Sequence, residues 1–194
     1  MIIEPVLDAL RAGEPVLLPT DTVYGLAALA TDADAVARLF ALKQRPVDTR
    51  IVALVADIEQ AEELVELGPV GRLLAEVFWP GALTIVATRR PGVDAAVGDT
   101  LTVGVRCPDN EIVRTLAHLA GPLAVTSANL HGELPPATAA EVASLFATVQ
   151  VVVDGGTSSG AASTVISIVD ESLTVLREGP ITAAEIDTAL RGGS

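Results

Sequence analysis

The stretch VLLPTDTVYG, residues 16–25, joins a short aliphatic strand, Val16–Leu18, to a loop of hydroxyl groups and one carboxylate that ends at a glycine. The next segment changes period: Thr31 can cap an amphipathic helix over Asp32–Leu42. Short β-branched runs and amphipathic segments alternate in this way along the chain. This alternation predicts an α/β domain.

The same pattern places the other elements on either side of this stretch. A first helix is expected over Glu4–Ala12, with Gly13 as its stop, and two helix starts have the capping-box spacing of Thr138 with Glu141 and Thr182 with Glu185. Further helices are expected at Ile58–Leu67, Val70–Phe78, Glu111–Leu119 and Ala139–Phe146, with a last one after Pro180. Further strands are expected at Ile51–Val55, Leu83–Thr88, Thr102–Arg106, Leu123–Thr126, Val149–Val153, Thr164–Ile168 and Leu173–Leu176.

Size and composition favour one domain over residues 1–194. Half of the 194 residues are apolar and no Pro/Gly/Ser-rich stretch divides the chain. The single cysteine, Cys107, excludes an intramolecular disulfide and a thiolate zinc cluster. The apolar runs are shorter than the ~20 residues of a membrane helix, and the start of the chain is not basic, so we expect a soluble cytoplasmic protein with no membrane partner.

The charge argues against nucleic-acid binding. The formal net charge is −13 and aromatic residues make up 3% of the chain, whereas nucleic-acid sites rely on cations and stacking rings. The only lysine, Lys43, lies close to Arg45 and Arg50. A local basic pocket for a small anion is compatible with an acidic exterior.

Two polar segments in the first quarter of the chain each have two interpretations. In PTDTVYG, Thr22 can offer a hydroxyl to a small polar ligand, or the loop can be an ordinary turn in which Thr and Asp bond their own backbone. In KQRP, Lys43 and Arg45 can reach one polyphosphate, or they can simply favour the end of a helix dipole. The residues alone do not decide between these interpretations. WPG, residues 79–81, is interpreted as structural.

Further candidates follow the later strands. Thr102, Gly104 and Arg106 share one face of a strand, where Arg106 either clamps a carboxylate or makes an ordinary surface ion pair. TSAN, residues 126–129, suits phosphate or carboxylate recognition but also forms plain turns. The loop 154–160 is either mobile or approaches a ligand closely, and it lacks the ending of a Walker A loop.

The order of these motifs is specific. PTDTVYGL, KQRP, WPGALT, VGVRCP, TSAN, STV and LREG resemble the ordered motifs of the YrdC-like threonylcarbamoyl-AMP synthases, from about Val16 to Gly179. The resemblance implies an open, twisted, mixed and largely parallel α/β sheet with a concave, basic ligand face. It also implies the condensation of L-threonine, bicarbonate and ATP for threonylcarbamoyl modification of tRNA, with Mg²⁺ carried on the ATP phosphates and a separate tRNA transferase as the downstream partner.

The resemblance also assigns roles to residues. Those implied to hold L-threonine are Thr22, Arg106 and Ser163. Those implied to surround ATP are Lys43, Arg45, Thr49, Thr102, Ser127, Asn129 and Arg177, and Lys43 and Arg45 are the cations expected to act on the transferring phosphate. No protein nucleophile is needed, because the protein aligns two anions and offsets the charge that develops on phosphate.

The chain departs from the family pattern at several positions. Arg50-Ile51 stands where a Pro-Leu pair is common, and Leu54, Asn110 and Pro135 stand where two histidines and a serine are common. His118, expected on a helix surface, and His131 do not replace them. The sequence ends soon after LREG, so we expect the single-domain form, without the extra C-terminal domain of longer members. A diverged paralogue that binds a nucleotide or a carbamoyl-adenylate-like ligand is therefore a second hypothesis, and an RNA-binding factor associated with tRNA or the ribosome is a third.

Overall fold

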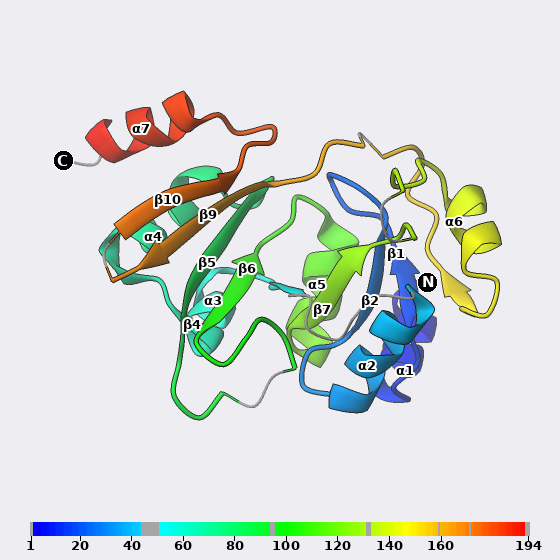
Figure 1. The fold of residues 1–194 in the computed structure, drawn as a ribbon. Coiled ribbons are helices and arrows are strands. Elements are labelled where there is room, and N and C mark those ends of the chain that lie inside the picture. Colours follow the sequence, from blue (N-terminus) through cyan, green and yellow to red (C-terminus); the bar gives the residue numbers. More distant parts are fainter. Residues whose placement is uncertain are drawn as a thin grey trace.

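The computed structural model describes residues 2–43, 51–93, 96–130, 133–158, 160–170 and 172–192. Helices and strands alternate along most of this part of the chain, which confirms the predicted α/β class (Figure 1). The helices are α1 (Ile3–Arg11), α2 (Ala33–Leu42), α3 (Ile58–Leu64), α4 (Gly68–Phe78), α5 (Glu111–Ala120), α6 (Ala139–Leu145) and α7 (Ala183–Gly192). The strands are β1 (Val16–Leu18), β2 (Gly25–Leu29), β3 (Val52–Leu54), β4 (Val65–Glu66), β5 (Leu83–Arg89), β6 (Thr102–Arg106), β7 (Leu123–Ser127), β8 (Val151–Val152), β9 (Thr164–Val169) and β10 (Ser172–Arg177).

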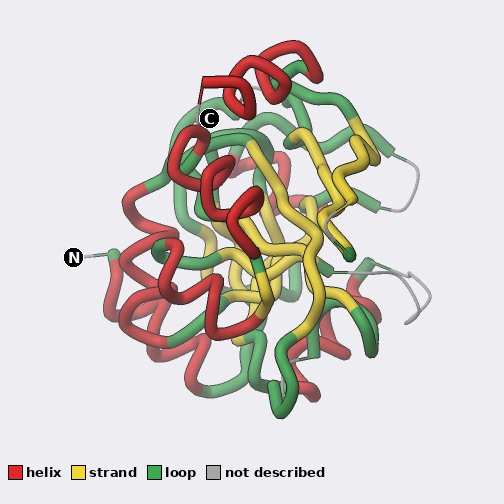
Figure 2. The backbone as a smooth tube through the Cα atoms, turned by 90° about the vertical axis from the view of Figure 1, so that its left-hand side faces the viewer, coloured by secondary structure: helices red, strands yellow, loops and turns green. Residues whose placement is uncertain are grey.

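One open sheet organises the molecule. The strands follow the order β10-β9-β5-β6-β3-β7-β2-β1-β8, and β4 pairs with β5 beside this path. Figure 1 shows the sheet running from β10 on the left to β1 and β2 on the right, and Figure 2 shows the strands as a central layer with helices on either side. Residues far apart in sequence, such as those that end β1, β6 and β7, are thereby brought to one region.

The sheet is mixed, as expected. Among the described strands, three pairs are parallel, β1 with β8, β3 with β6 and β5 with β9, and six are antiparallel. Parallel pairs therefore make up a smaller share of the described strand pairs than the description "largely parallel" implied. The physical reason is that the close connections from β1 to β2 and from β9 to β10 return the chain antiparallel, as short hairpin-like connections must.

Two apolar clusters hold the helices onto the sheet. The larger cluster joins α2, α3 and α4 to the strands and contains Leu39, Leu74 and Ile85, each fully buried. The smaller lies between α1, α5 and the neighbouring strands and contains Leu10 and Leu116. Aliphatic residues and alanine supply nearly all of both clusters, in keeping with the low aromatic content.

Local capping confirms several predicted boundaries. Gly13 follows α1 with φ of +72°, a left-handed conformation that suits glycine. Thr138 and Glu141 form a complete capping box at the start of α6. Thr182 and Glu185 exchange the same reciprocal hydrogen bonds before α7.

Three expectations about elements were wrong. Asp32, not Thr31, caps α2, because its carboxylate accepts from Ala35 N at 2.9 Å. The helix predicted over Ile58–Leu67 ends at Leu64, where the chain extends to pair with β5. The apolar run Gly25–Leu29, given no element, is the buried strand β2 between β1 and β7, and its short aliphatic and alanine side chains lack a distinctive period.

None of the helices in the described part of the chain has the length and apolar character required to cross a membrane.

Candidate functional site

A cavity of about 310 Å³ opens where β1, β3, β6 and β7 end or begin. Its described lining combines hydroxyl groups, two guanidinium groups and an aliphatic wall, and none of these lining residues carries a carboxylate. The lining residues are Thr20, Thr22, Val23, Gly25, Val52, Leu54, Arg106, Val125, Thr126, Ser127, Pro135, Ala162, Ser163 and Arg177. Five predicted site residues, Thr22, Arg106, Ser127, Ser163 and Arg177, therefore share one cavity.

Arg106 is the most constrained residue of the cavity. Its Nε donates to Gly81 O at 2.9 Å, its Nη1 to Thr22 Oγ1 at 2.9 Å and its Nη2 to Asp21 Oδ1 at 2.5 Å. The Arg106 side chain is 6% exposed and that of Asp21 is 15% exposed. The ion pair that one interpretation predicted is present, but it is buried beside the cavity and not on the surface.

The PTDTVYG loop contains the local turn that one of its two interpretations predicted. The Thr20 hydroxyl accepts from the backbone N–H of Thr22 and Val23, each at 3.2 Å, and donates to Val23 O, which is the local turn. Thr22 is 2% exposed, and its hydroxyl instead meets Arg106 and Thr20 at the cavity. Thr20 thus shapes the loop while Thr22 lines the cavity.

Ser163 and Arg177 also line the cavity. The Nε and Nη2 atoms of Arg177 donate to Ser163 O at 3.1 and 2.9 Å, and Nη2 reaches Ser163 Oγ at 3.4 Å. The arginine ends β10 and the serine directly precedes β9, so the antiparallel pair brings them together. The guanidinium fork holds the serine backbone in place beside the cavity.

Lys43 connects the helix α2 to the TSAN segment. Its Nζ donates to Thr126 Oγ1 at 3.1 Å, to Ser127 O at 2.5 Å, and to Ser127 Oγ and Asn129 Oδ1 at 3.3 Å each. The ammonium therefore contacts the end of β7 and Asn129. Lys43, Ser127 and Asn129 form one polar group next to the cavity.

Two arginines, Arg106 and Arg177, line the cavity. Burial lowers the pKa of the Arg106 guanidinium from its ordinary value, the Asp21 carboxylate opposes this shift, and the charge of Arg177 adds to it. The charge of Arg177 thus acts on Arg106 beside the cavity, where Asp21 is the ion-pair partner of Arg106.

Other predicted residues lie elsewhere or outside the described residues. Thr102 begins β6, whereas Arg106 ends it, and the Thr102 hydroxyl donates to the Asp99 carboxylate at 3.2 Å. Thr102 does not line the cavity, and its assignment to the nucleotide stays a prediction. Arg45 and Thr49, together with Arg50 and His131, fall outside the described residues.

The departures from the family pattern have local explanations. Leu54 is 4% exposed and, with Val52, forms part of the aliphatic wall of the cavity. Asn110 caps α5, where its Oδ1 accepts from Val113 N at 3.1 Å. Pro135 lines the cavity, and His118 is exposed on the last turn of α5, as expected for a helix-surface residue.

Sequence reasoning missed three residues that support the site. Asp21 forms an ion pair with Arg106, and the carbonyl oxygen of Gly81 accepts a hydrogen bond from Arg106. Thr84 Oγ1 lies 2.9 Å from Ser163 Oγ. Gly81 and Thr84 belong to WPGALT, whose WPG turn was interpreted as structural only. The type of a residue does not reveal that its backbone carbonyl accepts a hydrogen bond, so Gly81 could not be identified from the sequence. The Asp21 carboxylate, in a loop of hydroxyl groups, could have been identified as a partner for a cation.

The glycine-rich loop after β8 lies close to the PTDTVYG loop. The Tyr24 hydroxyl donates to Gly156 O at 2.7 Å and accepts from Gly155 N at 3.1 Å, while Gly160 N donates to Thr22 O at 3.0 Å. A Cβ at Gly155 would lie 2.4 Å from Pro19 Cβ. These contacts join the loop to the PTDTVYG loop, and its approach to a ligand stays a prediction; the chain then continues into Ser163.

Gly179 shows how tightly the chain packs around Ser163. A Cβ at this position would lie 2.4 Å from Ala162 O and 2.7 Å from Thr164 N, and backbone atoms at that distance cannot easily move. We expect Gly179→Ala to lower the free energy of unfolding by more than ~1 kcal/mol. Urea unfolding measures this change, with Gly192→Ala as the control because nothing lies within 4 Å of its added Cβ. An unchanged unfolding midpoint for Gly179→Ala would contradict this packing.

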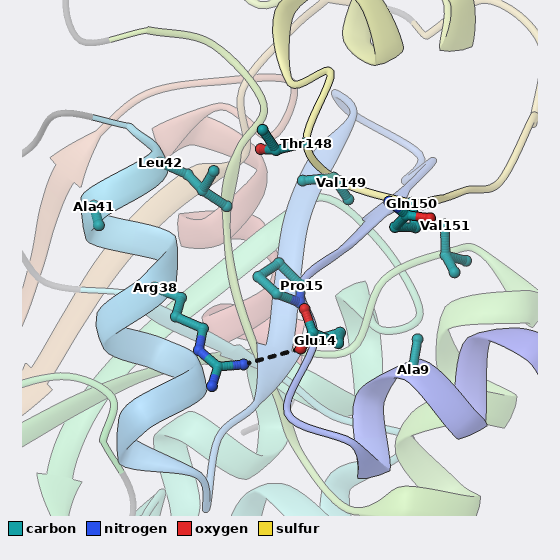
Figure 3. Close-up of a pocket in the computed structure, with 10 residues that line it drawn as sticks. All are labelled: Ala9, Glu14, Pro15, Arg38, Ala41, Leu42, Thr148, Val149, Gln150 and Val151. Atoms are coloured by element: carbon teal, nitrogen blue, oxygen red, sulfur yellow. Dashed lines mark hydrogen bonds and ion pairs between the residues drawn. The ribbon is translucent and has the colours of Figure 1, made fainter.

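A second cavity, of about 520 Å³, lies between α1, α2 and the segment before β8 (Figure 3). Figure 3 shows Arg38 and Glu14 paired with one another, and the other described lining residues are mostly aliphatic. Both side chains are at least half exposed, and no predicted site residue lines this cavity. It is larger than the first cavity but lacks its converging cations and hydroxyls.

The fold and the first cavity together define an α/β protein with a mixed sheet and a polar cavity lined by hydroxyl groups and two arginines. The sequence comparisons narrow this class. The Sua5/YciO/YrdC family model, described as telomere recombination, matches residues 8–179. The chain belongs to this family.

Individual relatives agree with that assignment. The chain is 38% identical to a threonylcarbamoyl-AMP synthase of Bacillus subtilis, over 93% of this chain and 54% of the relative, and 39% identical to a putative threonylcarbamoyl-AMP synthase of Mycobacterium tuberculosis H37Rv, over 94% and 86%. A crystal structure of P. abyssi Sua5 complexed with L-threonine superposes with a TM-score of 0.90 at 37% identity, over 97% of this chain and 57% of that one. The chain thus spans about half the length of the first curated relatives it matches.

Proposed function

We propose that this protein is an L-threonylcarbamoyladenylate synthase, which condenses L-threonine, bicarbonate and ATP to threonylcarbamoyl-AMP and pyrophosphate. The product would supply the threonylcarbamoyl group for the modified adenosine next to the tRNA anticodon. The observation that carries this proposal is the meeting of two polar groups: Arg106, Thr22 and Ser163 around the cavity, and Lys43 with Ser127 and Asn129 beside it.

The cavity has suitable chemistry for threonine. The guanidinium of Arg106 can bind the substrate carboxylate, and the hydroxyls of Thr22 and Ser163 can accept or donate hydrogen bonds to its polar groups. Val52, Leu54 and Val125 present aliphatic surface to the same space, which suits the substrate methyl group. The solved structure of P. abyssi Sua5 with L-threonine supports this choice of amino acid.

The proposed reaction needs positioned charge and no protein nucleophile. The threonine amine captures CO₂ derived from bicarbonate to give a carbamate, and a carbamate oxygen attacks the α-phosphorus of ATP as pyrophosphate leaves. Lys43 and Arg177 would offset the charge that develops on the phosphate oxygens, together with Arg45. Thr49 and Thr102, with Ser127 and Asn129, are proposed as further nucleotide contacts.

Magnesium is proposed to arrive on the phosphates of ATP. In the described part of the chain, no group of three or more His, Cys, Asp or Glu residues is arranged to hold a metal ion, and the described cavity lining has no carboxylate. Mg²⁺ commonly binds through substrate phosphates and retained waters, so this donor set fits a nucleotide-borne ion. Its chemistry there would be to neutralise phosphate charge.

We also propose the setting in which the protein acts. Residues 1–194 would form a single YrdC-like domain with a basic ligand face in an otherwise acidic, cytoplasmic protein of net charge −13. A separate tRNA transferase would receive the labile adenylate, because an acidic surface disfavours stable binding to nucleic acid.

One observation favours a second candidate function. Leu54 and Pro135 line the cavity at positions where the resembling family commonly has polar residues. A diverged protein that binds a nucleotide or a carbamoyl-adenylate-like ligand, without synthesis, would tolerate that loss of polar groups.

The test is to incubate the purified protein with ATP, Mg²⁺, bicarbonate and each of the twenty amino acids in turn, and to follow pyrophosphate release. Release that requires both threonine and bicarbonate is expected. Release with another amino acid would retain the chemistry and overturn the substrate. No release from a folded protein that still binds ATP would favour the second candidate, and salt-dependent RNA binding would favour an RNA-associated factor.

A further inference from the structure

Thr84 is a buried polar residue next to the cavity that the proposed reaction does not yet use. It lies in β5 and is 1% exposed. A Cβ at Gly104 would lie 3.6 Å from both Thr84 Cγ2 and Val52 Cγ2. Because Val52 lines the cavity, Thr84 is on the cavity side of the sheet.

The hydroxyl of Thr84 meets a side chain of the cavity itself. Thr84 Oγ1 lies 2.9 Å from Ser163 Oγ, although the two residues are 79 positions apart in the sequence. Ser163 is 7% exposed and lines the cavity. Either hydroxyl can donate, and in both cases the bond fixes the position of Ser163 Oγ.

Ser163 is held in two complementary ways. Arg177 donates two hydrogen bonds to its carbonyl oxygen, which fixes the backbone. A serine side chain can still choose among three staggered rotamers about Cα–Cβ. The 2.9 Å contact with Thr84 is shorter than the 3.4 Å contact of Ser163 Oγ with Arg177 Nη2, so we assign to Thr84 the larger part in selecting the rotamer of Ser163.

The neighbouring Thr164 shows what a purely structural threonine looks like in this region. Its hydroxyl donates to Ile181 O at 2.6 Å and accepts from Gly179 N and Ile181 N, which are all backbone groups of the next connection. The Thr84 hydroxyl is bonded instead to a side chain that lines the cavity. The two threonines therefore have different roles.

We propose that Thr84 is a positioning residue for substrate recognition: its hydrogen bond orients the Ser163 hydroxyl toward the amino-acid substrate in the cavity. This inference rests on the proposed function, in which Ser163 contacts L-threonine. Thr84 itself does not touch the ligand; its effect passes through Ser163.

The experiment is a double-mutant cycle on the full chain, with L-threonine binding measured by calorimetry. Thr84→Val removes the hydroxyl and keeps the shape, and we expect threonine affinity to fall about tenfold, as for one lost hydrogen bond to the ligand. Thr84→Ser restores the hydroxyl and should recover affinity to within about threefold. The double variant Thr84→Val with Ser163→Ala should bind no more weakly than Ser163→Ala alone, because Thr84 acts only through Ser163.

The matched control is Thr188→Val, which removes a threonine hydroxyl that bonds Ala184 O at 2.8 Å on α7. It should leave threonine affinity at the wild-type value. Unfolding midpoints of all variants separate loss of binding from loss of fold. Wild-type threonine affinity in Thr84→Val would overturn the inference. So would a double variant whose fold loss of affinity equals the product of the fold losses of the two single variants.

A failure of the proposed function is distinguishable from a failure of this inference. If the wild-type protein binds no threonine, the proposed function is overturned. A crystal structure of Thr84→Val then decides the positioning role by itself: a rotated Ser163 hydroxyl supports it, and an unmoved Ser163 Oγ overturns it.

Discussion

Replacing Arg106 with alanine is expected to reduce threonine-dependent pyrophosphate release by at least about 10³-fold and to destabilise the protein. The guanidinium is the proposed ligand of the substrate carboxylate, and it also neutralises Asp21, whose side chain is 15% exposed. Truncating one member of a largely buried ion pair is strongly destabilising, so the unfolding free energy should fall by about 3 kcal/mol. Single-turnover kinetics and urea unfolding measure the two effects separately.

Two variants make the Arg106 result interpretable. Arg106→Lys keeps the charge but cannot reproduce the three-way contact with Gly81, Thr22 and Asp21, so it should remain strongly impaired. Arg38→Ala removes an arginine from an exposed ion pair with Glu14 and should change stability by less than ~1 kcal/mol. Activity of Arg106→Ala within tenfold of the wild type would remove this residue from the proposed substrate site.

Replacing Lys43 with alanine is expected to lower the rate of pyrophosphate release by at least about 10²–10³-fold, because the lost charge acts on the transferring phosphate. The fold should persist, because Ser127 and Asn129 retain a hydrogen bond to one another when the ammonium is gone. Circular dichroism and the unfolding midpoint test the fold, while a coupled pyrophosphate assay tests the activity.

The control for Lys43 must come from another residue type, because the chain has one lysine. Arg191→Ala removes a cation from α7 whose side chain is 83% exposed, and its activity should equal that of the wild type. Arg177→Ala is expected to resemble Lys43→Ala, since it also loosens Ser163. A Lys43→Ala protein that releases pyrophosphate at the wild-type rate would place the nucleotide elsewhere.

Much of the fold could be predicted because hydrophobic period and capping act locally. The strand Val16–Leu18 and the helix starts at Thr138 and Thr182 follow from neighbouring residues alone. β2 was missed because its run of glycine, leucine and alanine has no strong period, and pairing with β1 and β7 defines it. The balance of parallel and antiparallel pairs also depends on strand order, which no local pattern encodes.

The site was predictable in its residues but not in its contacts. Thr22, Arg106 and Ser163 were identified from their motifs, and the structure places all three at one cavity. The partners that hold them, Gly81 O and the Thr84 hydroxyl, come from another motif and act across the sheet. Thr102 shares a strand face with Arg106, but the two residues lie at opposite ends of β6. Thr102 therefore does not line the cavity that Arg106 lines.

The most direct test of the central claim is mass spectrometry of the nucleotide products formed from ATP, L-threonine and ¹³C-bicarbonate. We expect an adenylate with the mass of threonylcarbamoyl-AMP that carries one ¹³C from bicarbonate and disappears when threonine is omitted. A folded protein that binds ATP yet forms no labelled threonine adenylate would contradict the proposed synthase.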